Sequence, residues 1–184
     1  MEHYYYYLIS SLPTLKRDDT PYHTVASFTA ICAEHISREE LRILNDLSLI
    51  PADDSLKNAA HGSFVSKWYE WENYLRNRIS KIRSVYLGRG SNKFLRPQEE
   101  HLMFPEIDKV ITEQLLSTGP ADKEKTLDNL RWTKLDELEL GHYFDFDILC
   151  SYKLKLLIRE KWLKRDLNKG MKNLNEIMNN VYSE

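Results

Sequence analysis

Apolar residues recur every three or four positions along most of this chain, a spacing that is typical of amphipathic helices. In residues 64–87 they form one stripe, which consists of Phe64, Trp68, Leu75, Ile79, Ile82 and Tyr86. Residues 145–167 carry two stripes on roughly opposite sides: Leu149, Tyr152, Leu156, Leu163 and Leu167, and then Leu154, Ile158 and Trp162. A helix that is apolar on two sides must be covered on both, so we expect this segment to lie centrally.

Two apolar stripes of this length need a common core, and we therefore predict that their main members are buried. These members are Phe64, Trp68, Leu75, Ile79, Leu149, Tyr152 and Leu156. Capping and stop signals divide the rest of the chain into further helices. The signals are a Ser37–Glu40 capping box, possible caps at Ser63 and Asp145, Pro120 as a first helical residue, and glycines at 88, 90, 119, 141 and 170.

The N-terminus departs from the helical pattern. Residues 4–9 are aromatic and strand-prone, but Ser10, Ser11 and Pro13 end the run at once, which leaves a short extended piece or a single turn packed on the body. The sequence therefore predicts an all-α fold of six to seven mostly antiparallel helices with a short extended N-terminal segment.

Residues 88–98 form the longest irregular connection between predicted helices. We place the boundary between an N-terminal helical lobe, residues 1–88, and a C-terminal helical lobe, residues 98–184, at this connection. The alternative is one continuous domain.

Composition excludes several classes of protein. A chain of 184 residues that is 42% hydrophobic and 29% charged has enough apolar side chains for a packed core and enough charge for a solvated surface. No apolar run approaches the about 18 residues of a spanning helix, and no signal-peptide pattern is present, so we expect a cytoplasmic protein without direct membrane insertion. Cys32 and Cys150 are predicted to be reduced core thiols, because neither lies in a metal-binding spacing.

The segment HYFDFD combines His142, Asp145 and Asp147, which are ligand types that metals use. We expect Asp145 to be a helix N-cap instead, because alternating residues at a helix start do not share a face. The sequence also contains no GxSxG, HExxH, Walker or GxGxxG motif. We therefore predict no enzyme activity, metal or cofactor; a small hydrolase built around HYFDFD is a weaker alternative.

A formal net charge of −2 hides a strongly uneven distribution of charge. Residues 73–98 contain seven cations and no acid, and residues 153–172 contain eight cations against two acids, whereas residues 99–147 contain thirteen acids and five bases. Such segregation is expected where a protein docks on partners of different sign. The alternative is a pair of solvated helix faces whose cations are partly neutralised by the acidic segment.

Glu72 lies at the margin of the 64–87 stripe, with Arg76 one turn further on and Arg83 on the same side. A carboxylate beside an apolar stripe needs partners, because an unpaired buried charge is costly. This cluster is either a catalytic carboxylate or a structural clamp between helices. We favour the clamp, because no nucleophile, second carboxylate or metal ligand lies nearby in the sequence.

Four segments together resemble a family of short proteins encoded in bacterial V/A-type ATP synthase operons. They are residues 4–13 (YYYYLISSLP), 67–77 (KWYEWENYLRN), 130–138 (LRWTKLDEL) and 144–147 (FDFD) running into 152–156 (YKLKL). The last segment, continued through Ile158 to Trp162, also resembles part of the C subunit of those machines, called d in the vacuolar enzyme. That subunit is an all-helical funnel that joins the central shaft to the rotor ring. The resemblance implies an accessory or C-like component with no catalytic residues to transfer.

We accordingly expect a non-enzymatic coupling or assembly subunit of a V/A-type (vacuolar-type) ATP synthase, a complex that transports protons or sodium ions. Its expected partners are central-stalk or rotor-ring subunits, which would hold it at the inner face of the membrane. The expected contact residues are Arg76, Arg83, Lys155, Arg159 and Lys161, with Glu72 and Asp145 as structural organisers.

The alternative function is a helical nucleic-acid-binding module that uses the cations between Arg76 and Arg96. Trp68, Tyr69, Trp71 or Tyr86 would then serve as stacking platforms for bases. We disfavour this alternative, because most of these aromatic residues fall on the apolar stripe and are expected in the core.

Overall fold

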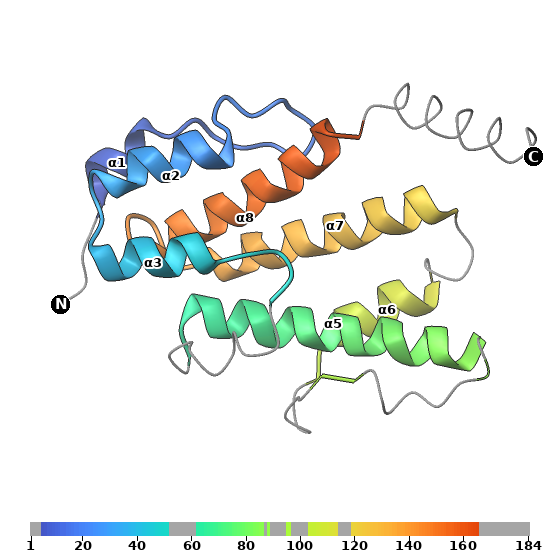
Figure 1. Cartoon of the computed structure of the whole chain (residues 1–184). Coiled ribbons are helices and arrows are strands. Elements are labelled where there is room, and N and C mark those ends of the chain that lie inside the picture. The colour runs from blue at the N-terminus through green and yellow to red at the C-terminus, as the bar shows by residue number, and fades with distance from the viewer. Residues whose placement is uncertain are drawn as a thin grey trace, which may run out of the picture.

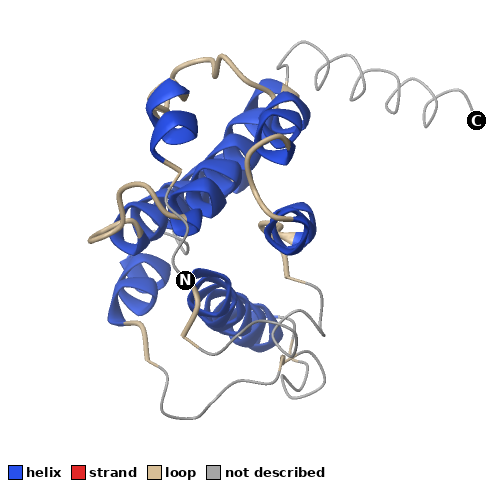
Figure 2. Cartoon of the chain, turned by 90° about the vertical axis from the view of Figure 1, so that its left-hand side faces the viewer, coloured by secondary structure: helices blue, strands red, loops and turns tan. Residues whose placement is uncertain are grey.

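The computed structural model describes residues 5–51, 62–86, 88, 95, 96, 103–113 and 119–165 (Figure 1). All regular elements in these residues are helices, as Figure 2 shows. They are α1 (Tyr6–Ser11), α2 (Val25–Ala33), α3 (Arg38–Asp46), α5 (Phe64–Tyr86), α6 (Pro105–Glu113), α7 (Pro120–Leu138) and α8 (Phe146–Leu163). The predicted all-α class is confirmed for this part of the chain.

Helix α8 is the central element. It packs against α7, α2, α3 and α5, and it lies between α2 and α7 in Figure 1. All its side chains from Leu149 to Leu156 are buried, and so is Ile158. The prediction that a helix with two apolar stripes lies centrally is therefore confirmed.

The core confirms six of the seven predicted buried residues and corrects one. Phe64, Trp68, Leu75, Leu149, Tyr152 and Leu156 are buried, whereas Ile79 is only partly buried. The reason lies in the C-terminal half of α5: beyond Leu75, its described side chains are half-buried or exposed, apart from Asn77 and Ser84. That half extends past the core. Both cysteines are buried and free, as predicted.

Local capping explains where several helices begin and end. Ser37 and Glu40 form the predicted capping box, in which the Ser37 hydroxyl accepts from the Glu40 amide at 3.2 Å and Glu40 accepts from the Ser37 amide at 3.0 Å. Asp145 accepts from the Ile148 amide at 3.3 Å, so its predicted N-cap role is confirmed. Past the end of α5, Gly88 adopts a φ of 60°, a left-handed conformation that favours glycine.

At the N-terminus the structure has a short helical segment, and the predicted extended piece is wrong. Residues 6–11 form the short helix α1, which buries Leu8. The Tyr5 amide donates to the carbonyl of Phe144 at 2.5 Å, and the rings of Tyr6 and Phe144 lie 4.7 Å apart. Contacts with the α7–α8 turn therefore hold this segment on the body; Tyr4 lies outside the described residues.

The described helices share one hydrophobic core. Buried side chains of α2, α3 and α5 belong to the same cluster as those of α6, α7 and α8. The choice between two lobes and one continuous domain stays a prediction. Most of the predicted boundary at 88–98, and the chain beyond residue 165, lie outside the described residues. No helix among the described residues combines the length and the apolarity that crossing a membrane requires.

The central position of α8 gives a test on stability. Leu154 is fully buried, so Leu154→Ala should lower the free energy of unfolding by about 2–5 kcal/mol. Leu163 on the same helix is 49% exposed, and Leu163→Ala should cost less than about 1 kcal/mol. Urea denaturation followed by circular dichroism measures both. Equal losses would contradict the central placement of α8.

Candidate functional site

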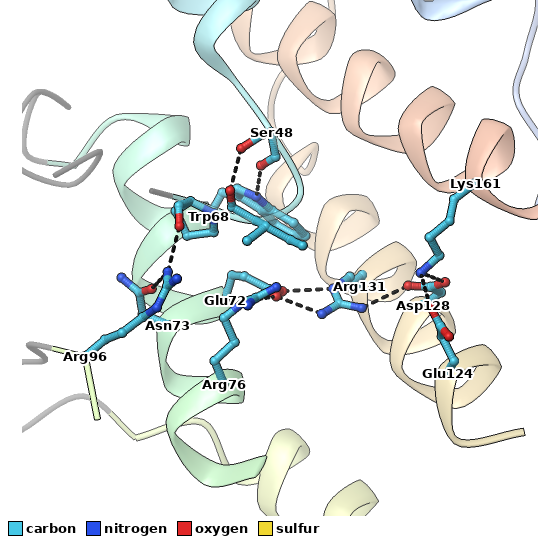
Figure 3. Close-up of polar contacts among 12 residues, drawn as sticks. Ser48, Trp68, Glu72, Asn73, Arg76, Arg96, Glu124, Asp128, Arg131 and Lys161 are labelled. Atoms are coloured by element: carbon cyan, nitrogen blue, oxygen red, sulfur yellow. Dashed lines mark hydrogen bonds and ion pairs between the residues drawn. The ribbon is translucent and has the colours of Figure 1, made fainter. Parts of the chain in front are cut away.

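Glu72, on α5, has a fully buried carboxylate. A buried charge of this kind is costly unless it has partners of opposite sign. Glu72 Oε1 accepts from Arg76 Nε at 2.9 Å and from Arg131 Nη2 at 2.7 Å, and its Oε2 accepts from Arg131 Nε at 2.9 Å (Figure 3). The predicted clamp and its partner Arg76 are confirmed. Among the described residues Arg83 is not a partner of Glu72; the bidentate partner is Arg131, on α7.

Arg131 also binds a second buried carboxylate, that of Asp128. Its Nη1 donates to Asp128 Oδ1 at 2.9 Å, and the Asp128 side chain is only 3% exposed. The other oxygen of Asp128 accepts from the indole of Trp162 at 2.8 Å and from Lys161, both on α8. Burial by itself lowers the pKa of Arg131, but Glu72 and Asp128 outweigh this effect and hold the pKa above its usual value.

The series ends near the surface at Glu124, one turn before Asp128 on α7. Glu124 accepts from Lys161 at 3.1 Å and from Arg165 at 2.7 Å. The hydrogen bond from Arg165 holds the pKa of Glu124 below its usual value, although burial opposes the shift. We call the complete series the charge chain; its members are Arg76, Glu72, Arg131, Asp128, Lys161, Glu124 and Arg165.

The charge chain joins α5, α7 and α8 in one fixed register. Spacings of three or four residues place its members on one face of each helix, as in Glu72–Arg76 and Asp128–Arg131. Each charge touches an opposite charge, and no nucleophilic side chain takes part in these contacts. The arrangement is suited to holding three helices together, and it supports the structural role predicted for Glu72.

Two buried asparagines of α5 form a second polar cluster. Asn77 exchanges two hydrogen bonds with the backbone of Arg96, at 2.8 and 3.0 Å. The Arg96 guanidinium donates to Asn73 at 3.1 Å and to the carbonyl of Pro51 at 2.7 Å (Figure 3). No motif or periodic pattern in the sequence marks these asparagines. The contacts engage Arg96, one of the cations that the nucleic-acid alternative requires.

Two of the predicted contact cations, Lys155 and Lys161, are neutralised by the acidic segment. Lys155 is buried and lies 2.7 Å from Asp136 and 2.7 Å from Glu139. Lys161 is paired within the charge chain. The acidic residues that pair with these two lysines all belong to segment 99–147. At Lys155 and Lys161 the structure therefore matches the alternative in which that segment neutralises the basic stretch. Their role in partner binding stays a prediction.

The other three predicted contact cations differ in exposure. Arg76 is half-buried against Glu72. Arg159 is half-buried and donates to the backbone carbonyls of Arg17 and Asp19, the latter at 2.9 Å. Arg83 is exposed near the end of α5. Of the five predicted residues, only Arg83 is exposed in the described structure.

The HYFDFD segment brings its three polar residues together at the start of α8. His142 Nδ1 lies 2.5 Å from Asp145 Oδ2 and 3.6 Å from Asp147 Oδ2, because His142 reaches both from the turn before α8. That alternating residues do not share a helix face does not separate these three, whereas the N-cap role predicted for Asp145 is confirmed. Burial raises the pKa of Asp147. In the described residues no group of three or more His, Cys, Asp and Glu side chains has the arrangement of a metal site.

Most of the aromatic residues that the nucleic-acid alternative requires lie in the core. Trp68 and Trp71 are fully buried and stacked on each other at 5.6 Å, and Tyr69 is 3% exposed. The Trp68 indole donates to the carbonyl of Ser48 at 3.3 Å (Figure 3). Their rings cannot stack on bases in this fold; the side chain of Tyr86 lies outside the described residues.

Comparison with known proteins adds one finding. The family model described as "Protein of unknown function (DUF2764)" matches residues 98–184, just under half of the chain. The matched part contains Asp128, Arg131 and Lys161 but not Glu72. Neither the curated proteins nor the solved structures gave a match.

The charge chain predicts a large difference between two arginines. Arg131→Met removes the bidentate partner of Glu72 and should lower the free energy of unfolding by about 3–5 kcal/mol, because it leaves buried carboxylates underpaired. Arg76→Met removes a half-buried partner that binds only one oxygen of Glu72 and should cost about 1 kcal/mol or less. Urea denaturation of both variants measures the difference; similar losses would contradict the clamp.

Acid should lower the stability of the fold through Glu124. Because the pKa of Glu124 is below its unfolded value, this residue stabilises the fold above the unfolded pKa, and the stabilisation disappears as pH falls through the folded pKa. The stability of the wild type should therefore fall more between about pH 6 and about pH 3 than that of Glu124→Gln. Arg165→Gln should weaken the dependence as well, since it removes the main cause of the shift. Parallel pH profiles for all three proteins would contradict this assignment.

Proposed function

We propose that this protein is a non-enzymatic coupling or assembly subunit of a V/A-type ATP synthase, similar to the C subunit. The observation that carries the proposal is the resemblance of residues 144–162 to part of that subunit, in a segment that is the central helix of an all-helical body. A C-like role needs a helical body, and α8 contacts four other helices. The expected partners are central-stalk or rotor-ring subunits.

The charge chain supports this role physically. A subunit that transmits position or torque between two partners must keep its helices in a fixed register under load. Hydrophobic contacts alone tolerate sliding, whereas a bidentate pair such as Arg131–Glu72 restricts it. We infer that the chain serves to stiffen α5, α7 and α8 relative to one another.

The exposed side chains in the C-terminal half of α5 form the surface that we propose for docking. Lys81 and Arg83 are exposed there, and no acid occurs in the sequence between residues 73 and 98. Complementary charge raises the rate of encounter with an acidic partner and opposes wrong partners. Of the predicted contact residues, Arg83 is thus the one that best suits a test by mutation, since Lys161 is needed by the charge chain.

The proposal predicts that this protein copurifies with ATP synthase subunits. After co-expression with the soluble and membrane subunits of the operon, an affinity tag on this protein should recover central-stalk or rotor-ring subunits. Lys81→Glu with Arg83→Glu should reduce this recovery at least tenfold without loss of helicity, because both side chains are exposed.

The matched control is Lys109→Glu with Lys125→Glu, which reverses two exposed lysines on α6 and α7, outside the two basic stretches. This control should bind like the wild type. Single-stranded RNA should show no micromolar binding at physiological salt; binding with a steep salt dependence would favour the nucleic-acid alternative. Recovery of this protein alone, with normal ATP synthase assembly in its absence, would refute the proposal.

A further inference from the structure

Residues 12–24 cross the surface of α8 and α7 as an irregular segment, which we call the strap. In Figure 1 the strap is the blue loop that leaves α1, reaches the C-terminal part of α8 and returns to the start of α2. Residues 16–20 are all exposed. Leu12 and Leu15 are only partly buried where they pack against the core. Few apolar contacts therefore hold the strap.

Polar contacts with α8 hold the strap at two places. Arg159 donates from Nε to the carbonyl of Asp19 at 2.9 Å and from Nη1 to the carbonyl of Arg17. The Tyr152 hydroxyl donates to the carbonyl of Pro13 at 3.0 Å. The strap thus occupies the guanidinium of Arg159, one of the predicted contact residues.

A third contact ties the strap to α7. The Arg17 guanidinium donates to Thr133 Oγ1 at 2.9 Å and lies 3.6 Å from Asp136. Thr133 and Asp136 are exposed, so water competes for these bonds. Segments that are held by a few solvent-accessible hydrogen bonds open locally, at much lower cost than global unfolding.

We propose that the strap opens as a unit while the helices stay folded, and that it controls a second contact of the partner, with α8, in addition to the docking surface on α5. When the strap is closed, its carbonyls occupy Arg159. When it is open, Arg159 lacks acceptors and is free to bind the carboxylates of an acidic partner surface, beside the Tyr152 hydroxyl. The identity of that partner, a central-stalk or rotor-ring subunit, rests on the proposed function.

Limited proteolysis tests the opening without any partner. Trypsin cleaves after Lys16 or Arg17 only when the strap leaves α8 and extends. Tyr152→Phe with Thr133→Val removes two of the strap bonds and keeps the ring of residue 152, which packs on Phe28. This variant should be cleaved about tenfold faster at the strap than the wild type, while its urea unfolding stays cooperative and loses only the about 1.4 kcal/mol that a tenfold change represents.

Thr112→Val is the matched control, because it removes an exposed hydroxyl bond on α6. It should be cleaved at the wild-type rate. Equal cleavage rates in all three proteins, or cleavage that follows global unfolding, would overturn the opening of the strap whatever the protein binds.

A reversible lock tests the control of binding. In Arg17→Cys with Thr133→Cys, a short bismaleimide joins the strap to α7, and the same variant capped with N-ethylmaleimide leaves the strap untied. Cys32 and Cys150 are buried, and burial raises the pKa of both thiols, so the new thiols react first. The locked form should bind the ATP synthase subunits at least tenfold more weakly than the capped form.

The two experiments separate the possible failures. Equal binding of the locked and capped forms would overturn the control by the strap and leave the proposed function supported. If no ATP synthase subunit binds either form, the proposed function and the control of its binding surface both fail, whereas the opening of the strap stands on the proteolysis result.

Discussion

The arrangement of α5, α7 and α8 depends on the burial of one charged group, the carboxylate of Glu72. Glu72 is a carboxylate without access to water, and a charge in that position is tolerated only with close partners of opposite sign. Arg131 supplies the partner from α7 and is itself 9% exposed, so it requires Asp128, which in turn requires a donor from α8. Each buried charge that pairs with its neighbour must itself be paired with a further charge, until the series reaches the surface at Glu124. The positions of α5, α7 and α8 follow from this sequence of requirements.

The central helix shows how cations can belong to a core. Lys153 is 5% exposed, and its ammonium group donates to the carbonyls of Leu44 and Asn45 at the end of α3, the latter at 3.1 Å. Burial lowers the pKa of Lys153, but the negative end of the α3 dipole suits a cation there. Lys155 meets Asp136 and Glu139 of the neighbouring chain segment. The lysines of α8 thus tie α3 and α7 to the centre, while their aliphatic stems pack with the apolar stripes.

What the sequence predicted correctly is mostly local. The helices, the Ser37 capping box and the Asp145 cap depend on residues within four positions of each other, and so does the Glu72–Arg76 pair. Arg131 lies 59 residues from Glu72, and periodicity on one helix says nothing about which distant side chain faces it. The same limit applies to charge: a count of cations in residues 153–172 cannot tell that Lys161 points at Asp128 rather than at solvent. The role of Arg159 depends on a strap with no periodic pattern at all.

The path of the charge chain also determines how far this polypeptide can be treated as modular. A cut in residues 88–98 would separate Glu72 from Arg131. The C-terminal piece would then keep an arginine with Asp128 as its remaining carboxylate, and the N-terminal piece would keep a carboxylate with Arg76 alone. Neither piece is electrostatically self-sufficient. Gene duplication, fusion or domain exchange at that position would succeed only where the incoming segment supplies a replacement carboxylate at the same height on the neighbouring helix.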